Sequence, residues 1–254
     1  MNKITEVVGS AKSAPVPRPV VTLSYAQTLD GRIATSTGSS QWISSPRSLR
    51  FSHELRAEHE AIMVGAGTVC MDDPRLTVRL ATGPDPQRVV VDSTLRTPST
   101  AAVLANGAAP GTIFAVTERA PTAKRDRVRA LGATVLCLPT NARGRVDLVS
   151  LLTALHRRGI GSVLVEGGAR MITALLRARL VDRLAVCVAP KILGTGIEAV
   201  GDLGIRELAC SLIVTETSVT PYGEDLVLEG RVDYPGAPPM AVDSPEDLKC
   251  VTAS

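Results

Sequence analysis

Short apolar runs alternate with segments of helical character along most of this 254-residue chain. The apolar runs have the length of strands and cover residues 20–26, 61–65, 88–91, 113–116, 134–138, 162–165 and 184–189. Between them the sequence predicts helices over 45–58, 121–131, 148–158 and 166–178. Because parallel strands need a helical crossover between them, this order predicts an α/β protein with a mostly parallel sheet and helices on both faces.

The last part of the domain has a different pattern. Residues 212–219 and 225–232 alternate between apolar and polar side chains, and Tyr222-Gly223 lies between them. This pattern predicts a C-terminal antiparallel hairpin that makes the sheet mixed. We expect one domain over 19–232, a polar loop over 28–40, and flexible tails at 1–18 and 233–254.

Composition excludes several classes of protein. Aromatic residues make up only 2% of the chain, whereas single-stranded nucleic-acid binders stack bases on aromatic side chains. The net charge of +3 is too small to indicate a nucleic-acid partner. The five cysteines are scattered, which favours reduced thiols over disulfides or zinc. No apolar run resembles a signal peptide or a membrane span, so we expect a cytoplasmic protein without a membrane partner.

Glycine turns follow three of the apolar runs, at 65–67, 167–168 and 194–196. Glycine lets the backbone approach a ligand closely, and ligands of open α/β folds bind at the carboxyl ends of the strands. A single turn of this kind is ordinary, but three on one sheet indicate a dinucleotide or phosphosugar site. The dinucleotide fingerprint itself is poor, because Cys70 stands where its third glycine belongs.

Acidic residues accompany two of these turns. Asp72-Asp73 follows the first turn and could be a solvated turn or part of a ligand site. Glu166 precedes the second, where a carboxylate is either a favourable charge at a helix N-terminus or a catalytic or ligand-binding acid. Asp92-Ser93 and Arg96 follow another strand, as an ordinary polar turn or as a site for a ribose 2′-phosphate, which would indicate NADPH.

Other motifs are missing. His53 and His59 in HELRAEH are six residues apart and fall on different helix faces, so they do not form the zinc motif HExxH. The chain also lacks a zinc deaminase pattern, a GxSxG elbow and a Walker loop. We therefore expect no metal site, and neither hydrolase nor kinase activity.

Five segments in order carry a family resemblance: VTLSYAQTLDGRIATSTGSSQWI, IMVGAGTVCMDDPRLTVRL, RVVVDSTLRTP, VLVEGGARMITALL and VAPKILGTG. Over residues 19–232 the chain resembles the reductase domain of the riboflavin-biosynthesis deaminase-reductase and its stand-alone relatives. The resemblance implies a dihydrofolate-reductase-like fold, a homodimer and NADPH as cofactor. It also implies a reaction, in which the ribose of a ribosylaminopyrimidine 5′-phosphate is reduced to a ribityl chain.

The same resemblance implies a set of site residues. The catalytic candidates are Asp72 and Glu166. The positions that match substrate contacts are Ser40, Arg56, Leu76 and Arg79. The positions that match the cofactor side are Thr28, Asp30, Thr68, Ser93, Arg96, Gly167, Gly168 and Gly194.

One position departs from the bacterial pattern. Ser24 stands where bifunctional enzymes carry a lysine, and the chain shows no deaminase domain. Both features indicate a stand-alone reductase that acts on 5-amino-6-ribosylaminouracil phosphate or on 2,5-diamino-6-ribosylaminopyrimidinone phosphate. Two alternatives stay open, a paralogous NADPH-dependent reductase with another substrate and a non-catalytic nucleotide-binding relative. The presence of Asp72 and Glu166 counts against the second alternative.

Overall fold

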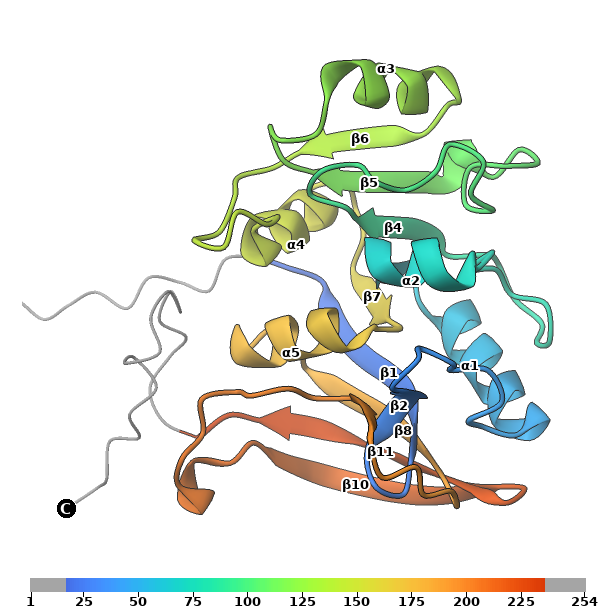
Figure 1. Ribbon diagram of the computed structural model, residues 1–254, viewed down its shortest axis with the longest axis vertical. Coiled ribbons are helices and arrows are strands. Elements are labelled where there is room, and N and C mark those ends of the chain that lie inside the picture. The colour runs from blue at the N-terminus through green and yellow to red at the C-terminus, as the bar shows by residue number, and fades with distance from the viewer. Residues whose placement is uncertain (1–16, 236–254) are drawn as a thin grey trace, which may run out of the picture.

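Nine strands form one central sheet in the computed structural model, which describes residues 17–235 (Figure 1). They are β1 (Val20–Thr28), β3 (Ala61–Gly65), β4 (Gln87–Val91), β5 (Thr112–Val116), β6 (Thr134–Cys137), β7 (Ser162–Val165), β8 (Arg183–Ala189), β10 (Ile213–Tyr222) and β11 (Asp225–Asp233). Their order across the sheet is β10-β11-β8-β1-β7-β3-β4-β5-β6. All pairings from β8 to β6 are parallel, while β11 pairs antiparallel with β8 and with β10. The predicted parallel sheet and C-terminal hairpin are confirmed.

Five α-helices connect the strands: α1 (Pro46–Glu58), α2 (Ala66–Asp72), α3 (Thr122–Ala130), α4 (Leu148–His156) and α5 (Ala169–Arg177). Helix α1 begins where the sequence predicts, because Ser45 caps it by accepting the backbone N–H of Ser48 and Pro46 occupies its first turn. Two short 3-10 turns, at Ala109–Gly111 and Leu208–Cys210, complete the helical structure of residues 17–235.

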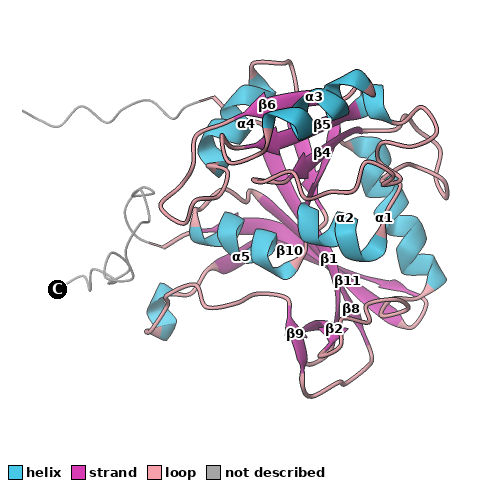
Figure 2. Cartoon of the chain, turned by 45° about the horizontal axis from the view of Figure 1, so that its top comes forward, coloured by secondary structure: helices cyan, strands magenta, loops and turns pink. Residues whose placement is uncertain are grey.

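The helices cover both faces of the sheet, as predicted (Figure 2). Helices α4 and α5 bury leucines such as Leu151 and Leu175 against Val21, Leu23 and the same-side residues of the neighbouring strands. Helices α2 and α3 pack on the opposite face, where their valines contact the side chains of β3, β4 and β5. Helix α1 lies on this second face over β7 and β8. The aliphatic core therefore has two layers with the sheet between them.

The expected polar loop over 28–40 is partly wrong. It contains a short strand, β2 (Arg32–Thr35), which pairs antiparallel with β9 (Gly196–Glu198) in a separate two-stranded sheet. Strand β1 also continues to Thr28, beyond its predicted end at residue 26. Four residues are too few for a periodic pattern, and the partner strand lies far away in the sequence, so local pattern analysis misses this pairing.

The two predicted tails lie mostly outside the described residues, at 1–16 and 236–254. The domain bounds of 19–232 stay a prediction, but contacts of the described residues extend past both limits. Arg18 donates two hydrogen bonds to the carboxylate of Asp182, at 2.7 and 2.8 Å. At the other end, the Tyr234 hydroxyl donates to the carbonyl of Val181 at 3.0 Å.

The structure also gives findings on membrane-spanning helices and on the state of the cysteines. In the described part of the chain, no helix is long and apolar enough to cross a membrane. Cys70, Cys137 and Cys187 are free thiols, but the expectation of reduced cysteines is wrong for Cys210, which is disulfide-bonded. Scattered cysteine positions carry no information on which thiols the fold brings together.

Candidate active site

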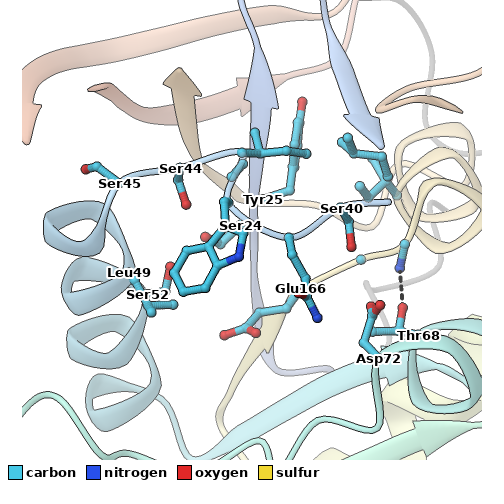
Figure 3. A pocket seen from close by; sticks show the side chains of 18 of the residues that line it. Ser24, Tyr25, Ser40, Ser44, Ser45, Leu49, Ser52, Thr68, Asp72 and Glu166 are labelled. Atoms are coloured by element: carbon cyan, nitrogen blue, oxygen red, sulfur yellow. Dashed lines mark hydrogen bonds between the residues drawn. The ribbon is translucent and has the colours of Figure 1, made fainter. Parts of the chain in front are cut away.

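A cavity of about 400 Å³ opens at the carboxyl ends of the central parallel strands (Figure 3). Because β1, β7 and β3 are adjacent and parallel, their carboxyl ends meet at one edge of the sheet. The cavity is lined by residues of β1 and β2, of the turn after β7, of α1, α2 and α5, and of the segment before α1: Ser24, Tyr25, Ala26, Ile33, Ser40, Gln41, Trp42, Ile43, Ser44, Ser45, Pro46, Leu49, Ser52, Arg56, Thr68, Asp72, Glu166, Gly167, Gly168 and Ile172.

Helix periodicity selects the side chains on two walls. From the N-cap Ser45 onward, the α1 lining residues Leu49, Ser52 and Arg56 recur at spacings of three or four, which places them on one helix face, and Pro46 lies beside the cap. On α2, Thr68 and Asp72 are separated by four residues, so both face the cavity from the other side. These two walls therefore present mainly hydroxyl and charged groups, while apolar side chains such as Ile33, Trp42 and Ile172 line other parts of the cavity.

Two glycines form the edge of the cavity at the end of β7. Gly167 has φ +93°, a left-handed conformation that side chains disfavour, and its peptide bond to Gly168 is cis. The backbone N–H of Gly168 donates to Thr68 Oγ1 at 3.1 Å, the contact drawn in Figure 3. The Gly167 carbonyl accepts the N–H of Gly65 at 3.2 Å. Two of the predicted glycine turns are thus joined directly.

Glu166 is tied to an arginine on the opposite wall. Arg56 donates from Nε and Nη2 to the two oxygens of Glu166, at 2.6 and 2.7 Å. Burial lowers the pKa of Arg56, but the charge and hydrogen bonds of Glu166 outweigh it, so the net pKa is raised. Both residues line the cavity, so Glu166 is a cavity carboxylate and not a helix cap.

Asp72 has different surroundings. It is the last residue of α2 and its side chain is exposed at the cavity rim. Partial shielding from water raises the pKa of its carboxyl, and a hydrogen bond from Ser40 opposes this rise. The two catalytic candidates thus face one cavity with different partners, Arg56 for Glu166 and Ser40 for Asp72.

Half of the predicted site residues line this cavity: Ser40, Arg56, Thr68, Asp72, Glu166, Gly167 and Gly168. The others lie elsewhere, for reasons that local motifs do not reveal. Leu76 has 2% of its surface exposed, and its side chain packs in the core and not in the cavity. Arg79 is exposed just outside the cavity and donates to Thr77 Oγ1 at 2.7 Å.

Thr28, Asp30 and Gly194 do come together, but outside the cavity lining. The carboxylate of Asp30 accepts the Thr28 hydroxyl at 2.6 Å and the Gly194 N–H at 2.6 Å. These hydrogen bonds, with that of Thr28 the strongest, hold the pKa of Asp30 at about 2. The cluster joins the end of β1 to the segment before β9.

The predicted turn at Ser93 and Arg96 is also outside the cavity lining. Asp92 closes this turn by accepting the backbone N–H and the hydroxyl of Thr97, at 2.8 and 2.7 Å. Arg96 is exposed, and its guanidinium approaches Gly67 at the start of α2. The turn is therefore an ordered polar turn with one outward-facing arginine next to the helix that carries Thr68 and Asp72.

Sequence reasoning missed one wall of the cavity. Trp42 lies in the segment between β2 and α1, with 74% of its surface exposed and φ +65°. The ammonium of Lys191 holds this segment by donating to the carbonyls of Trp42 and Ile43. Trp42 is the chain's one tryptophan and stands in a serine-rich segment, a signal that could have marked it as a surface group. Within residues 17–235, no three His, Cys, Asp or Glu side chains gather as a metal site.

Comparison with known protein families gives a match over most of the chain. The RibD C-terminal domain family matches residues 19–228. A 2,5-diamino-6-ribosylamino-4(3H)-pyrimidinone 5′-phosphate reductase from Methanothermobacter thermautotrophicus is 45% identical over 221 residues, which cover 85% of this chain and 99% of that protein. The riboflavin biosynthesis protein RibD of Aquifex aeolicus is 42% identical over 212 residues, which cover 83% of this chain and 57% of that protein. The chain thus spans little more than half the length of the RibD protein.

Solved structures agree with these matches. Acinetobacter baumannii RibD superposes with a TM-score of 0.74 at 29% identity, covering 85% of this chain and 58% of that one. The riboflavin biosynthesis reductase Rib7 of Saccharomyces cerevisia superposes with a TM-score of 0.67 at 26% identity, covering 85% and 90%. These similarities confirm the fold that the sequence resemblance implies.

Proposed function

The chain belongs to the RibD C-terminal domain family, and on that premise we propose that it reduces the ribose of a ribosylaminopyrimidine 5′-phosphate to a ribityl chain with NADPH, in riboflavin biosynthesis. The observation that carries the proposal is the 45% identity to a pyrimidinone phosphate reductase over 99% of its length. The name of that relative makes 2,5-diamino-6-ribosylaminopyrimidinone phosphate the first substrate to test. We further propose, from the family resemblance, a homodimer that works in the cytoplasm.

The residues at the cavity fit a dinucleotide cofactor. The Gly167-Gly168 edge has no side chains to obstruct a ligand, and α5 begins directly after it, so unpaired N–H groups at that helix start favour a pyrophosphate. Thr68 would border the cofactor from α2, while Ser93 and Arg96 would hold a ribose 2′-phosphate. When bound, NADPH would supply the hydride. The 2′-phosphate contacts make NADPH the proposed cofactor rather than NADH.

Reduction of the sugar needs a proton as well as a hydride, because ring opening and hydride addition at C1′ leave oxygen and nitrogen atoms to be protonated. Asp72 is the proposed proton donor, since its pKa is raised and it stands at the rim of the cavity. Glu166 is paired with Arg56 and is the proposed acceptor for substrate hydroxyl groups. These roles divide proton transfer and binding between the two carboxyls.

The substrate phosphate is assigned to the arginines beside the cavity. Arg56 directs two of its nitrogens at Glu166, so Arg79 is the freer of the two predicted phosphate ligands. Arg79 makes no ion pair with any carboxylate of residues 17–235, and an arginine can grip a phosphate with two hydrogen bonds. We propose that Arg79 provides the main phosphate contact.

The test is an assay of NADPH oxidation with each of the two ribosylaminopyrimidine phosphates, followed by identification of the ribityl product. We expect turnover of the diaminopyrimidinone with NADPH and much slower turnover with NADH. Turnover of neither pyrimidine by folded protein would reject the proposed reaction and favour a paralogous reductase. Failure to bind NADPH at all would favour the non-catalytic alternative.

A further inference from the structure

Two side chains on one face of α1 fasten residues 77–79 beside the cavity. His53 and Arg56 are three residues apart on the helix, and both are buried, with 0% and 8% of their surface exposed. The Nδ1 atom of His53 accepts the backbone N–H of Arg79 at 2.9 Å. Arg56 Nη1 donates to the carbonyl of Thr77 at 3.1 Å. The short segment is therefore held to α1 at two points.

Arg56 also connects this clamp to the cavity, because its other nitrogens bind Glu166. The guanidinium of Arg79 lies close enough for Arg56 and Arg75 to act on it electrostatically. Burial is the largest cause that lowers the pKa of Arg79, and the positive charges of Arg56 and Arg75 add to it. A group of cations that repel one another is stabilised when an anion binds between them.

The hydrogen bond determines the state of the histidine ring. A backbone N–H can only donate, so Nδ1 carries no proton and the neutral ring carries its proton on Nε2. Arg56 Nη1, 3.5 Å from Nε2, is also a donor, so this contact is not a hydrogen bond in that tautomer. Burial, Arg56 and Arg79 lower the pKa of His53 to about 4, against the weaker effects of Glu166 and Asp85. The ring is therefore neutral at physiological pH and keeps Nδ1 available as an acceptor.

We propose that His53 is a positioning residue, which holds the backbone of Arg79 so that this guanidinium stands ready beside Arg56 for the 5′-phosphate of the substrate. The inference rests on the proposed function, because it takes the phosphorylated substrate from there. It assigns His53 an effect on binding of the phosphate end, not on the chemical step, since the ring does not line the cavity where reduction would occur.

Kinetics of two variants test this role. His53→Leu keeps the approximate volume but removes the acceptor, and we expect KM for the phosphorylated substrate to rise about tenfold, equivalent to about 1.4 kcal/mol. The turnover number and KM for NADPH should change less than about threefold. His53→Asn offers an amide oxygen in place of Nδ1, and we expect it to restore most of the loss. The proposal would be overturned if, in both variants, KM rose and the turnover number fell by the same factor.

Direct binding separates this inference from the proposed reaction. Calorimetry with ribose 5-phosphate, and with ribose as the unphosphorylated probe, does not require turnover. His53→Leu should weaken ribose 5-phosphate binding about tenfold without changing the response to ribose. Unchanged binding in a folded variant overturns the positioning role even if the native enzyme reduces its substrate. His156→Leu, at an exposed position of α4, is the matched control and should behave like the native protein.

A measurement on the native protein covers the case in which His53→Leu fails to fold. The chain has three histidines, so ¹⁵N NMR can follow each ring. We expect one histidine with its proton on Nε2 and no titration above about pH 5. Titration of all three rings between about pH 6 and 7 would overturn the proposal, because a ring protonated there could not accept the Arg79 amide.

Discussion

At the scale of single residues, Asp72 and Glu166 show how surroundings assign different properties to similar groups. Both oxygens of Glu166 accept hydrogen bonds from Arg56, whereas Asp72 accepts a hydrogen bond from Ser40 and has a raised pKa. We therefore assign proton transfer to Asp72 and leave Glu166 to binding.

Replacement of Asp72 by Asn tests this division. The amide keeps the shape of the side chain but cannot transfer a proton, so we expect turnover to fall about a hundredfold, the usual scale for a lost acid–base group. KM for NADPH should change little. The neighbouring Asp73→Asn is the matched control, since Asp73 faces the backbone N–H of Ala102 and not the cavity. Near-normal turnover of folded Asp72→Asn protein would remove Asp72 from the mechanism.

Arg96 is the residue on which the cofactor preference depends. If its exposed guanidinium binds the 2′-phosphate, Arg96→Ala should raise KM for NADPH about tenfold and leave the weak use of NADH unchanged, because NADH has no phosphate there. Steady-state kinetics with both cofactors measure the ratio. Arg127→Ala, at an exposed position of α3, is the control. Equal use of both cofactors by the native protein would contradict the assignment.

Sequence motifs identified several cavity residues but not how their atoms are used. Arg56 was expected to hold a phosphate, yet most of its hydrogen-bonding capacity goes to Glu166, which is 110 positions away in the sequence. Leu76 matches a binding motif while its side chain is buried in the core. A motif predicts which positions gather at a site, but the direction of each side chain depends on distant partners that the motif does not contain.

At the scale of elements, most local signals predict correctly, except that the glycine turn and acidic pair around residues 65–73 contain the unpredicted helix α2, and non-local pairings are not predicted. The start of α1 could be predicted because the Ser45 cap and Pro46 act within one helical turn. Strand β2 could not, because its pairing depends on β9, more than 160 positions later. The hydrogen bonds that fix the start of α1 also come from a residue far away in the sequence, and we call them the α1 anchor. Asp225 on β11 accepts the backbone N–H of Ser45 and the hydroxyl of Ser48, both at 2.6 Å.

Removal of the α1 anchor should lower the free energy of unfolding. Burial alone would raise the pKa of Asp225, but the hydrogen bonds from Ser48 and Ser45 outweigh it and lower the pKa. With 2% of Asp225 exposed, Asp225→Ala leaves two donors without a partner, so we expect a loss of about 2–4 kcal/mol in the free energy of unfolding. Urea denaturation measures it. Asp233→Ala, at an exposed position of the same strand, should cost less than about 1 kcal/mol, and equal losses would contradict the anchor.

At the scale of the whole molecule, the order of strands creates the site. Alternating strands and helices predict a parallel sheet, but they do not predict that β7 inserts between β1 and β3. Crossover helices permit several neighbours for each strand, and the choice depends on how the two layers of side chains pack. That insertion places Glu166 opposite α1 and next to α2. The cavity is therefore a property of the topology, although each of its residues lies in a recognisable local motif.

The free energy of unfolding at acid pH should depend on the buried side chain of His53. The pKa of His53 is about 4 in the folded protein and about 6.5 in an unfolded chain, so between these values the unfolded state binds the proton and the folded state does not. The contribution of His53 to stability is therefore fully present above about pH 6.5 and is lost as the pH falls towards 4. Each pH unit in this window costs at most about 1.4 kcal/mol.

The expected result is that the free energy of unfolding of the native protein falls by about 2 kcal/mol more than that of His53→Asn between pH 7 and about 4.5. Asparagine does not titrate, so the variant lacks the proton uptake that favours unfolding, even if it is less stable at neutral pH. Asp72 acts in the opposite direction, because a raised pKa stabilises the fold as the pH falls, and it is present in both proteins. Urea denaturation at several pH values measures both curves. Parallel curves would show that His53 titrates alike in the folded and unfolded states and would contradict the lowered pKa.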